Sequence, residues 1–137
     1  MPRDTSAKGT AIERLVIMIL MAAGYTVHRC VKTVVRTPIG HRTIAQDIFG
    51  CIDLVCKKGD EPTLWIQVTS ETAVTKKVEA LAAVPWSTQH DRVEIWRWVG
   101  GRPTRRKNGT LRPARFFQLY RRNASFEFDE LDRIFLL

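Results

Sequence analysis

The chain has 137 residues, of which 45% are hydrophobic and 26% are charged, so it is long enough to bury one core and fits one compact domain. Its 22 Lys and Arg outnumber its 14 Asp and Glu. The formal net charge of +8 favours a polyanionic partner, with nucleic acid as the leading candidate. Charge alone also fits a solvated surface that binds nothing, so the motifs must decide between the two.

The cysteines and the longest apolar run indicate in which cellular compartment the protein works. The three cysteines, Cys30, Cys51 and Cys56, are odd in number and lack CxxC spacing, which argues against a disulfide framework and a zinc ribbon. The apolar run over residues 15–23 is well short of the roughly 18 residues that a membrane span needs, and no signal-peptide cleavage pattern follows it. We therefore expect an intracellular, cytoplasmic protein that does not enter a membrane.

Two elements are predicted in the N-terminal third. Residues 11–23 are good helix formers closed by Gly24, a natural C-terminal cap, and predict a helix. Apolar residues lie on more than one side of this helix, so one face can meet a partner subunit. Residues 25–35 are rich in β-branched and aromatic side chains and predict a strand, followed by a loop over residues 37–46.

The middle of the chain predicts a hairpin, a helix and a further strand. Residues 52–57 and 63–69 are strand-like, and the short connection between them contains the Gly and Pro typical of a hairpin. Residues 71–84 carry an apolar stripe at helical spacing, and residues 93–99 alternate as a strand does. The predicted order is α-β-β-β-α-β, which indicates an α/β fold with a mixed sheet flanked by helices.

The composition changes over residues 100–137. Arginine and lysine accumulate there with no acidic residue until Glu127, which predicts an electropositive segment. A short strand or docked segment is expected at residues 116–120 and a closing helix at residues 127–137. All 137 residues are expected to form a single domain, with its core over about residues 7–99.

The predicted hairpin brings oxygen-bearing side chains together. A turn centred near Asp60 pairs residues whose numbers sum to about 120, which sets Asp53 opposite Gln67. Thr69 then shares their face of the sheet. With a backbone carbonyl such as that of Val68, these groups offer a hard cation several oxygen ligands. The sequence therefore predicts a magnesium site, in which manganese can substitute.

This pattern resembles the PD-(D/E)XK nucleases. Gly50-Cys51-Ile52-Asp53 is followed at hairpin distance by Trp65-Ile66-Gln67-Val68-Thr69, and a helix that carries Glu13 precedes both. Within that superfamily the pattern is most similar to the archaeal-type Holliday junction resolvases, with phage proteins of similar build. The resemblance implies a restriction-endonuclease-like fold and metal-dependent hydrolysis of DNA in recombination and repair.

The resemblance also implies roles for individual residues. Asp53 falls on the metal-binding aspartate of the family, and Glu13 falls on the glutamate of its first helix. Gln67 stands at the (D/E) position and Thr69 at the lysine position, so two of the four residues depart from the pattern. Glutamine offers the metal a carbonyl oxygen without charge, so metal affinity should be lower unless Asp47 or Glu13 compensates.

A lysine on the following helix can supply the cation that Thr69 lacks. Lys76 and Lys77 both lie there, and we favour Lys77. In the implied mechanism the metal neutralises the phosphate and activates a water, the lysine stabilises the developing charge, and Glu13 contacts a metal-bound water. Asp47 can hold a water or a second metal. The product should carry a 5′-phosphate.

The expected partner is branched or double-stranded DNA. The candidate DNA contacts are Arg29, Lys32, Arg36, Arg42, Thr69, Arg102, Arg105, Arg106 and Lys107. Because a four-way junction presents two equivalent strands, the resemblance implies a two-fold homodimer. The apolar residues of the helix at 11–23 and the tryptophans of the strand at 93–99 are the candidate interface.

Simpler roles remain open for the same residues. Asp53 can be a hairpin-edge carboxylate, Gln67 a buried amide satisfied by the backbone, and Glu13 a partner of the helix dipole. Lysines on a helix usually form a solvated face. Two other functions are open as well. One is a PD-(D/E)XK nuclease that cuts duplexes, nicks or flaps, and the other is a DNA-binding protein that has lost catalysis.

Overall fold

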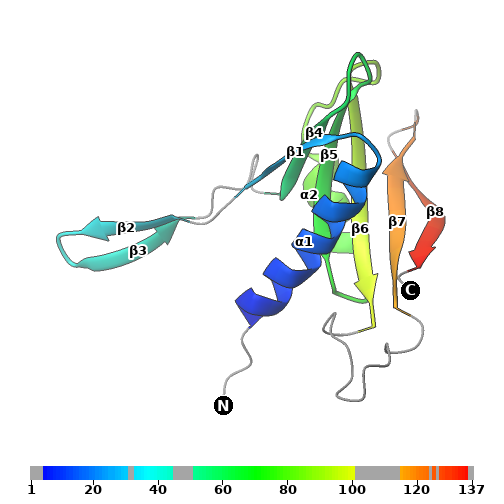
Figure 1. Cartoon of the computed structure of the whole chain (residues 1–137). Helices are drawn as coiled ribbons and strands as arrows, with labels where there is room; N and C mark the ends of the chain where they lie inside the picture. Colours follow the sequence, from blue (N-terminus) through cyan, green and yellow to red (C-terminus); the bar gives the residue numbers. More distant parts are fainter. Residues whose placement is uncertain are drawn as a thin grey trace, which may run out of the picture.

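The structure is a computed structural model, which describes residues 5–30, 33–44, 51–100, 115–123, 125 and 127–135. The helices of this part are α1 (Thr5–Ala22) and α2 (Thr75–Ala82). Its strands are β1 (Thr26–Arg29), β2 (Thr33–Thr37), β3 (Gly40–Ile44), β4 (Leu54–Lys57), β5 (Thr63–Thr69), β6 (Asp91–Val99), β7 (Phe116–Arg122) and β8 (Phe128–Phe135). The fold is α/β, with a mixed six-stranded sheet and a separate two-stranded sheet (Figure 1).

The strand order of the large sheet is β1-β4-β5-β6-β7-β8. β1, β4 and β5 are antiparallel neighbours, whereas β6 runs parallel to β5 and antiparallel to β7, which pairs with β8. A parallel pair needs a crossover connection, and α2 provides it between β5 and β6. This arrangement leaves the start of β4 and the end of β5 at the same end of the sheet.

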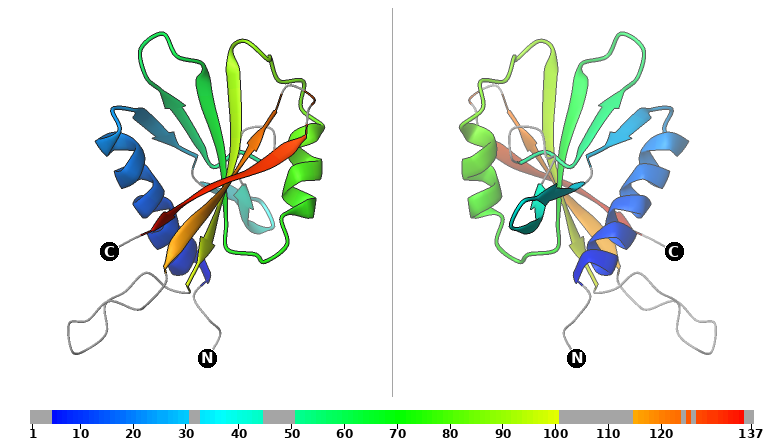
Figure 2. Two further views of the ribbon diagram at one scale, coloured as in Figure 1. Left: turned by 90° about the vertical axis from the view of Figure 1, so that its right-hand side faces the viewer. Right: turned by 90° about the vertical axis from the view of Figure 1, so that its left-hand side faces the viewer.

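One helix packs on each face of the sheet (Figure 2). α1 buries Ile12, Val16 and Leu20 in a cluster that includes Leu54 and Ile66 of the central strands. On the opposite face, α2 contributes Leu81 to a second cluster of buried residues. The other buried members of this cluster are Cys51, Ile52, Trp86, Val93 and Ile95. Alternate residues of β4, β5 and β6 therefore belong to different clusters, as the two-residue period of a strand requires.

A buried ion pair crosses the α1 face. Glu94 is only 3% exposed, and its carboxylate accepts a hydrogen bond from Trp96 Nε1 at 3.0 Å. Arg121 donates its Nε to Glu94 Oε2 at 2.8 Å and places Nη2 2.7 Å from the same oxygen. Burial, and secondarily the charge of Glu94, raise the pKa of the nearby Cys56 thiol to about 12. That thiol therefore stays protonated at neutral pH and behaves as a core residue.

The prediction of a helix at residues 127–137 was wrong, because β8 occupies Phe128–Phe135. Leu131 and Ile134 pack against the α1 cluster and Phe128 against the α2 cluster, so the segment contributes to both faces. A register shift between Gln118 and Tyr120 of β7 accompanies this pairing. Residues 128–135 form a strand because they pair with the free edge of β7. Local sequence preference does not contain this long-range pairing.

The prediction for residues 25–46 was also partly wrong. The single expected strand is two, because β1 ends at Arg29 and β2 begins at Thr33, and part of the expected loop is β3. β2 and β3 pair antiparallel around Pro38 and Ile39, and Gly40 follows with a φ of 139° that suits only glycine. This β2–β3 ribbon extends away from the large sheet (Figure 1).

The helix boundaries and the tryptophans differ from expectation too. α1 begins earlier than residue 11, and α2 begins at Thr75 with Val74 as its N-cap residue, which makes no side-chain cap hydrogen bond. Trp96 and Trp98 are 3% and 2% exposed, so both belong to the core of the chain. They cannot form the dimer interface that was suggested for them.

We expect Arg121→Met to destabilise the fold, because it leaves the Glu94 carboxylate buried without its counter-charge. The free energy of unfolding should fall by about 2–4 kcal/mol, at or below the range of a fully buried pair since Arg121 is partly exposed. The double variant Glu94→Gln/Arg121→Met should recover most of the loss, because the amide oxygen still accepts from Trp96. Urea denaturation measures both. A double variant no more stable than Arg121→Met would contradict this account.

Candidate functional site

The site lies where β4 begins and β5 ends. The antiparallel register pairs Leu54 with Ile66 and Val55 with Trp65, which confirms the pairing predicted for the hairpin. Asp53 precedes the first residue of β4 and is fixed by its backbone. Its N–H donates to Ile66 O at 2.9 Å, and its carbonyl accepts from Cys30 N–H at 2.8 Å. The Asp53 side chain is therefore held between β1 and β5.

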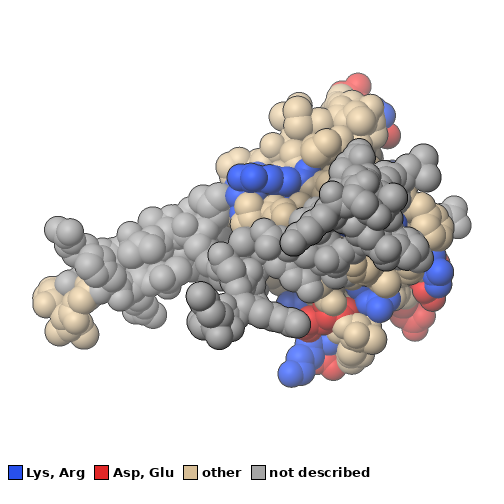
Figure 3. All heavy atoms as spheres, turned by 60° about the horizontal axis from the view of Figure 1, so that its bottom comes forward, with Lys and Arg blue, Asp and Glu red and all other residues tan. Residues whose placement is uncertain are grey.

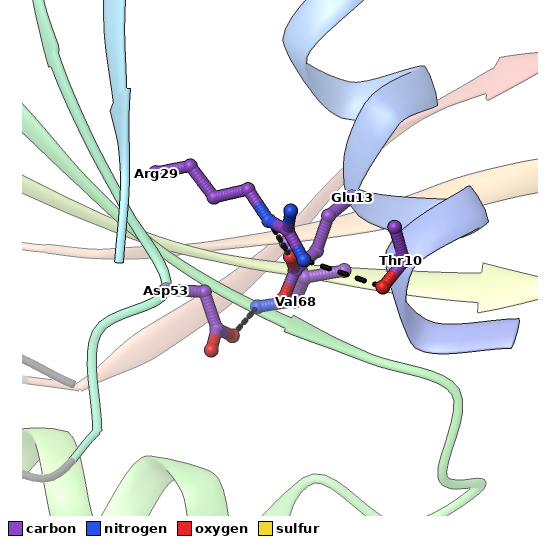
Figure 4. A network of polar contacts seen from close by, with 5 residues as sticks. All are labelled: Thr10, Glu13, Arg29, Asp53 and Val68. Atoms are coloured by element: carbon purple, nitrogen blue, oxygen red, sulfur yellow. Dashed lines mark hydrogen bonds and ion pairs between the residues drawn. The ribbon is translucent and has the colours of Figure 1, made fainter. Parts of the chain in front are cut away.

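The Asp53 carboxylate completes the backbone pairing of β5. Its Oδ2 accepts a hydrogen bond from Val68 N–H at 2.8 Å (Figure 4). Val68 lies two residues past Ile66, the last residue of β5 that pairs with β4. Within a strand, the N–H and C=O of one residue point to the same neighbour, so the Val68 carbonyl also faces the space beyond β4. A carboxylate and a backbone carbonyl thus lie at the same place, as a metal site needs.

Gln67 and Thr69 follow on the other face of β5. They are 8% and 7% exposed and alternate with Val68, so they lie on the α2 side with Trp65. Gln67 Nε2 donates to the Val68 carbonyl at 3.3 Å, which places the amide at the end of the strand. Among the described residues, no donor is recorded for the Gln67 side-chain oxygen. That oxygen is the neutral ligand that the site can offer to a cation.

Thr69 has a local role at the end of β5. Its Oγ1 accepts a hydrogen bond from Glu71 N–H at 3.1 Å, a turn that redirects the chain toward α2. Thr69 is 7% exposed, so it is too buried to serve as the DNA contact that was expected. Thr69 stabilises the connection that carries the two lysines.

Glu13 reaches the same end of the sheet from α1 but is paired with a cation. Its Oε2 lies 2.6 Å from Arg29 Nε, and Arg29 Nη2 donates to Thr10 Oγ1 at 3.3 Å (Figure 4). The exposed fractions of the side chains are 34% for Arg29 and 18% for Glu13. Arg29, which was expected to contact DNA, neutralises the glutamate of the first helix.

The two candidate lysines lie in the first turn of α2. Lys77 is half-buried and Lys76 is exposed. Neither makes an ion pair or hydrogen bond within the ranges that the structure describes. Figure 3 shows the end of the molecule at the bottom of Figure 1, where some described Lys and Arg side chains lie next to Asp and Glu. Neither lysine is therefore neutralised by a carboxylate of the described part of the chain.

Several candidate residues fall elsewhere. Asp47, Lys32, Arg102, Arg105, Arg106 and Lys107 lie outside the described residues. Arg36 is on β2 opposite His41, and Arg42 is on β3 opposite Val35, so both belong to the β2–β3 ribbon. Arg115, which the sequence analysis counted in the electropositive segment, is buried against the Trp98 ring at 5.3 Å.

The described residues contain no group of three or more His, Cys, Asp or Glu side chains placed to hold a metal ion. A cation between Asp53 and Gln67 would therefore depend on neutral oxygens and on ligands from substrate or solvent. Comparisons with models of known families, with characterised proteins and with solved structures give no match. No helix in the described part of the chain is long and apolar enough to cross a membrane.

Sequence reasoning missed the pair between Glu13 and Arg29. The two residues are separated by sixteen positions across a helix and a strand, and no spacing rule links such elements. The Val68 contact could have been found, because the register of the hairpin leaves its N–H beyond the end of β4. The acceptor that the register brings there is the Asp53 carboxylate.

We expect Arg29→Gln to strengthen binding of Mn²⁺, because it releases the charge of Glu13 toward the site. The free energy of unfolding should fall by only about 0.5–1 kcal/mol, as the pair is partly exposed. Calorimetry should show a Kd for Mn²⁺ that is several-fold lower. The control is Arg14→Gln, which removes an exposed arginine beside Glu13 and leaves the ion pair intact. Equal tightening in both variants would show an effect of net charge alone.

Proposed function

We propose that the protein is a metal-dependent DNA endonuclease of the PD-(D/E)XK type that acts on branched DNA, with four-way junctions as its substrate. The observation that carries this proposal is the Asp53 carboxylate held at Val68 N–H beside Gln67, at the end of the β4–β5 pair. The order of a helix, three antiparallel strands of one sheet, a second helix and a parallel strand supports it.

The residues present fit a hard divalent cation that is bound weakly. Asp53 would supply the negative charge, while the Gln67 and Val68 carbonyl groups would supply neutral oxygens. Magnesium bound there contributes charge neutralisation at the phosphate and activation of a water. Lys77, from the first turn of α2, would stabilise negative charge on the phosphate, and Glu13 would orient a water at the site.

The β2–β3 ribbon supports DNA as the substrate. It is inserted between β1 and β4, so it starts beside Asp53 and extends away from the sheet (Figure 1). Residues 30–46 contain no acidic side chain, and the ribbon carries Arg36 and Arg42. A two-stranded ribbon fits the major groove. Its tip presents Ile39, which is 99% exposed and suits contact with bases unstacked at a branch point.

A homodimer would place two such sites on the two equivalent strands of a junction. The face that supports this part of the proposal is the exposed side of α1, where Met18 and Met21 are 64% and 61% exposed. An oligomeric state is measured directly by analytical ultracentrifugation. A protein that stays monomeric with and without junction DNA would contradict paired cleavage.

The second candidate function is a DNA-binding protein that does not cleave. Three observations favour it, since Glu13 is paired with Arg29, Gln67 is uncharged, and Thr69 has no ammonium group at the lysine position of the family. A nuclease for duplexes, nicks or flaps is a further alternative within enzymes. Substrate preference separates that alternative from a junction resolvase, and metal-dependent cutting separates both from a binding protein.

We expect symmetric cuts in a labelled four-way junction with magnesium, and none in a linear duplex or with EDTA. Asp53→Asn should abolish cutting while DNA binding is retained, because it removes the negative charge that is held at Val68 N–H. Gln67→Glu should lower the magnesium concentration for half-maximal cutting several-fold, since it adds a charged ligand. Asp60→Asn, in the exposed hairpin turn, is the matched control. Binding without cutting in magnesium or manganese would establish the second candidate instead.

We expect Arg36→Gln/Arg42→Gln to weaken junction binding while the structure of the large sheet is unchanged. The dependence of log affinity on log salt concentration should become shallower by about 1–2, because each lost phosphate contact accounts for about 0.9. Fluorescence anisotropy with a labelled junction measures this slope. Lys58→Gln, an exposed charge at the far β4–β5 turn, is the control. An unchanged slope in the double variant would show that the β2–β3 ribbon does not contact DNA.

A further inference from the structure

An arginine-lined hollow lies at the end of the large sheet opposite Asp53. Its volume is about 230 Å³, and it forms where β6 begins and β7 ends. Arg92 comes from β6, whereas Arg121 and Arg122 come from the end of β7. Asp91 is the only carboxylate in its lining among the described residues. The neutral donors Thr88 and Asn123 complete the polar part; we call this feature the arginine hollow.

Three described carboxylates near the arginine hollow accept hydrogen bonds from other groups, among them Asp129, which accepts from Asn123 Nδ2 at 3.1 Å. The Asp91 carboxylate accepts from Trp65 Nε1 and from Ser87 N–H, both at 2.8 Å, so it anchors the loop before β6. Glu94 binds Arg121 and is buried in the core. Asp91 therefore has two firm donors of its own.

Arg92 is the residue whose position these contacts do not explain. It is half-buried, and within the described ranges it makes no ion pair or hydrogen bond. Burying part of a guanidinium is unfavourable unless an acceptor receives its donors. Arg122 lines the same space and donates Nη2 to the neutral Ser87 carbonyl at 3.3 Å, so it adds a second guanidinium beside the first.

The chemistry of the arginine hollow selects for a phosphate group. A planar guanidinium group can donate two parallel N–H hydrogen bonds to two oxygens of one phosphate. An apolar or cationic ligand has no acceptors for these donors. A volume of about 230 Å³ is smaller than the roughly 300–1,000 Å³ of ordinary ligand pockets, so one phosphate fits better than a whole nucleotide. A phosphate carried on a longer polymer satisfies both conditions.

The position of the arginine hollow relates it to the proposed DNA site. β5 and β6 pair from Thr63 with Asp91 to Thr69 with Arg97, and the arginine hollow and the Asp53 site lie at the two ends of this pairing. At about 3.3 Å per residue the ends are roughly 20 Å apart. Phosphates of one strand advance about 3.4 Å each along the helix axis, so this span corresponds to about six nucleotides.

We propose that the arginine hollow binds a backbone phosphate of a DNA arm whose branch point lies at Asp53. This inference rests on the proposed function, since it assigns the phosphate to the same DNA. This contact would orient the DNA arm, and it would not touch the phosphate that is cut. Arg92 and Arg122 are its ligands, whereas Arg121 is retained by Glu94 for the stability of the core.

The first test uses inorganic phosphate and the whole, isotope-labelled chain. Titration at constant ionic strength should shift the Nε–Hε signals of Arg92 and Arg122 to saturation, and Arg92→Gln should abolish the shift at Arg122. The signal of Arg14, exposed on α1, is the internal control. Shifts of equal size at Arg14 would overturn the proposal, because they would report only the general effect of an anion.

The second test uses DNA in the non-cleaving Asp53→Asn background, with junctions whose arms have four or twelve base pairs. Arg92→Gln should make the salt dependence of long-arm binding shallower by about 0.9 and leave short-arm binding unchanged. Equal effects on both lengths, or none on the long arm, would overturn the DNA assignment. If the unsubstituted protein binds neither junction, the proposed function fails, while the phosphate titration still decides whether the arginine hollow binds an anion.

Discussion

The unequal lengths of β4 and β5 determine where the Asp53 carboxylate lies. β5 continues to Thr69, but its partner starts at Leu54, so the Val68 amide extends past the ladder and needs an acceptor. The Asp53 carboxylate meets that need at 2.8 Å, which fixes its side chain. The same hydrogen bond therefore supports the end of the sheet and holds a negative charge beside the Val68 carbonyl. An aspartate in a strand interior would have neither role.

The two ion pairs of the described residues differ in solvent exposure, and therefore in how much their separation would cost. Glu94 and Arg121 meet beside Trp96 in the core, where Glu94 is 3% exposed and the loss of one partner would leave a buried charge. The pair of Glu13 and Arg29 is at the end of the sheet and is partly open to solvent, so its separation costs little. Under the proposed function, a DNA phosphate bound by Arg29 would release Glu13 toward a cation. The core pair has no such freedom.

The sequence predicted the elements whose patterns are local. The helix before Gly24 and the hairpin of β4 and β5 follow from periodicity and turn residues, and the predicted register agrees with the pairing of Leu54 with Ile66. β8 was missed because residues 128–135 mix charged and apolar side chains in a way that also suits a helix, and only the edge of β7 makes them a strand. The partner of Glu13 was missed for a related reason, since the contact depends on how α1 crosses β1. Long-range packing, and not propensity, decided each of these.

Under the proposed function, metal and DNA would bind cooperatively. Glu13 is paired with Arg29, the Asp53 carboxylate accepts from Val68 N–H, and Gln67 contributes an oxygen without charge. Magnesium in proteins is commonly held by one or two carboxylates together with substrate phosphates. In this chain the phosphate would have to provide much of the missing negative charge, so each ligand would raise the affinity for the other by the same factor. A site of this composition would hold little metal in the absence of DNA and would become complete only on the strand to be cut.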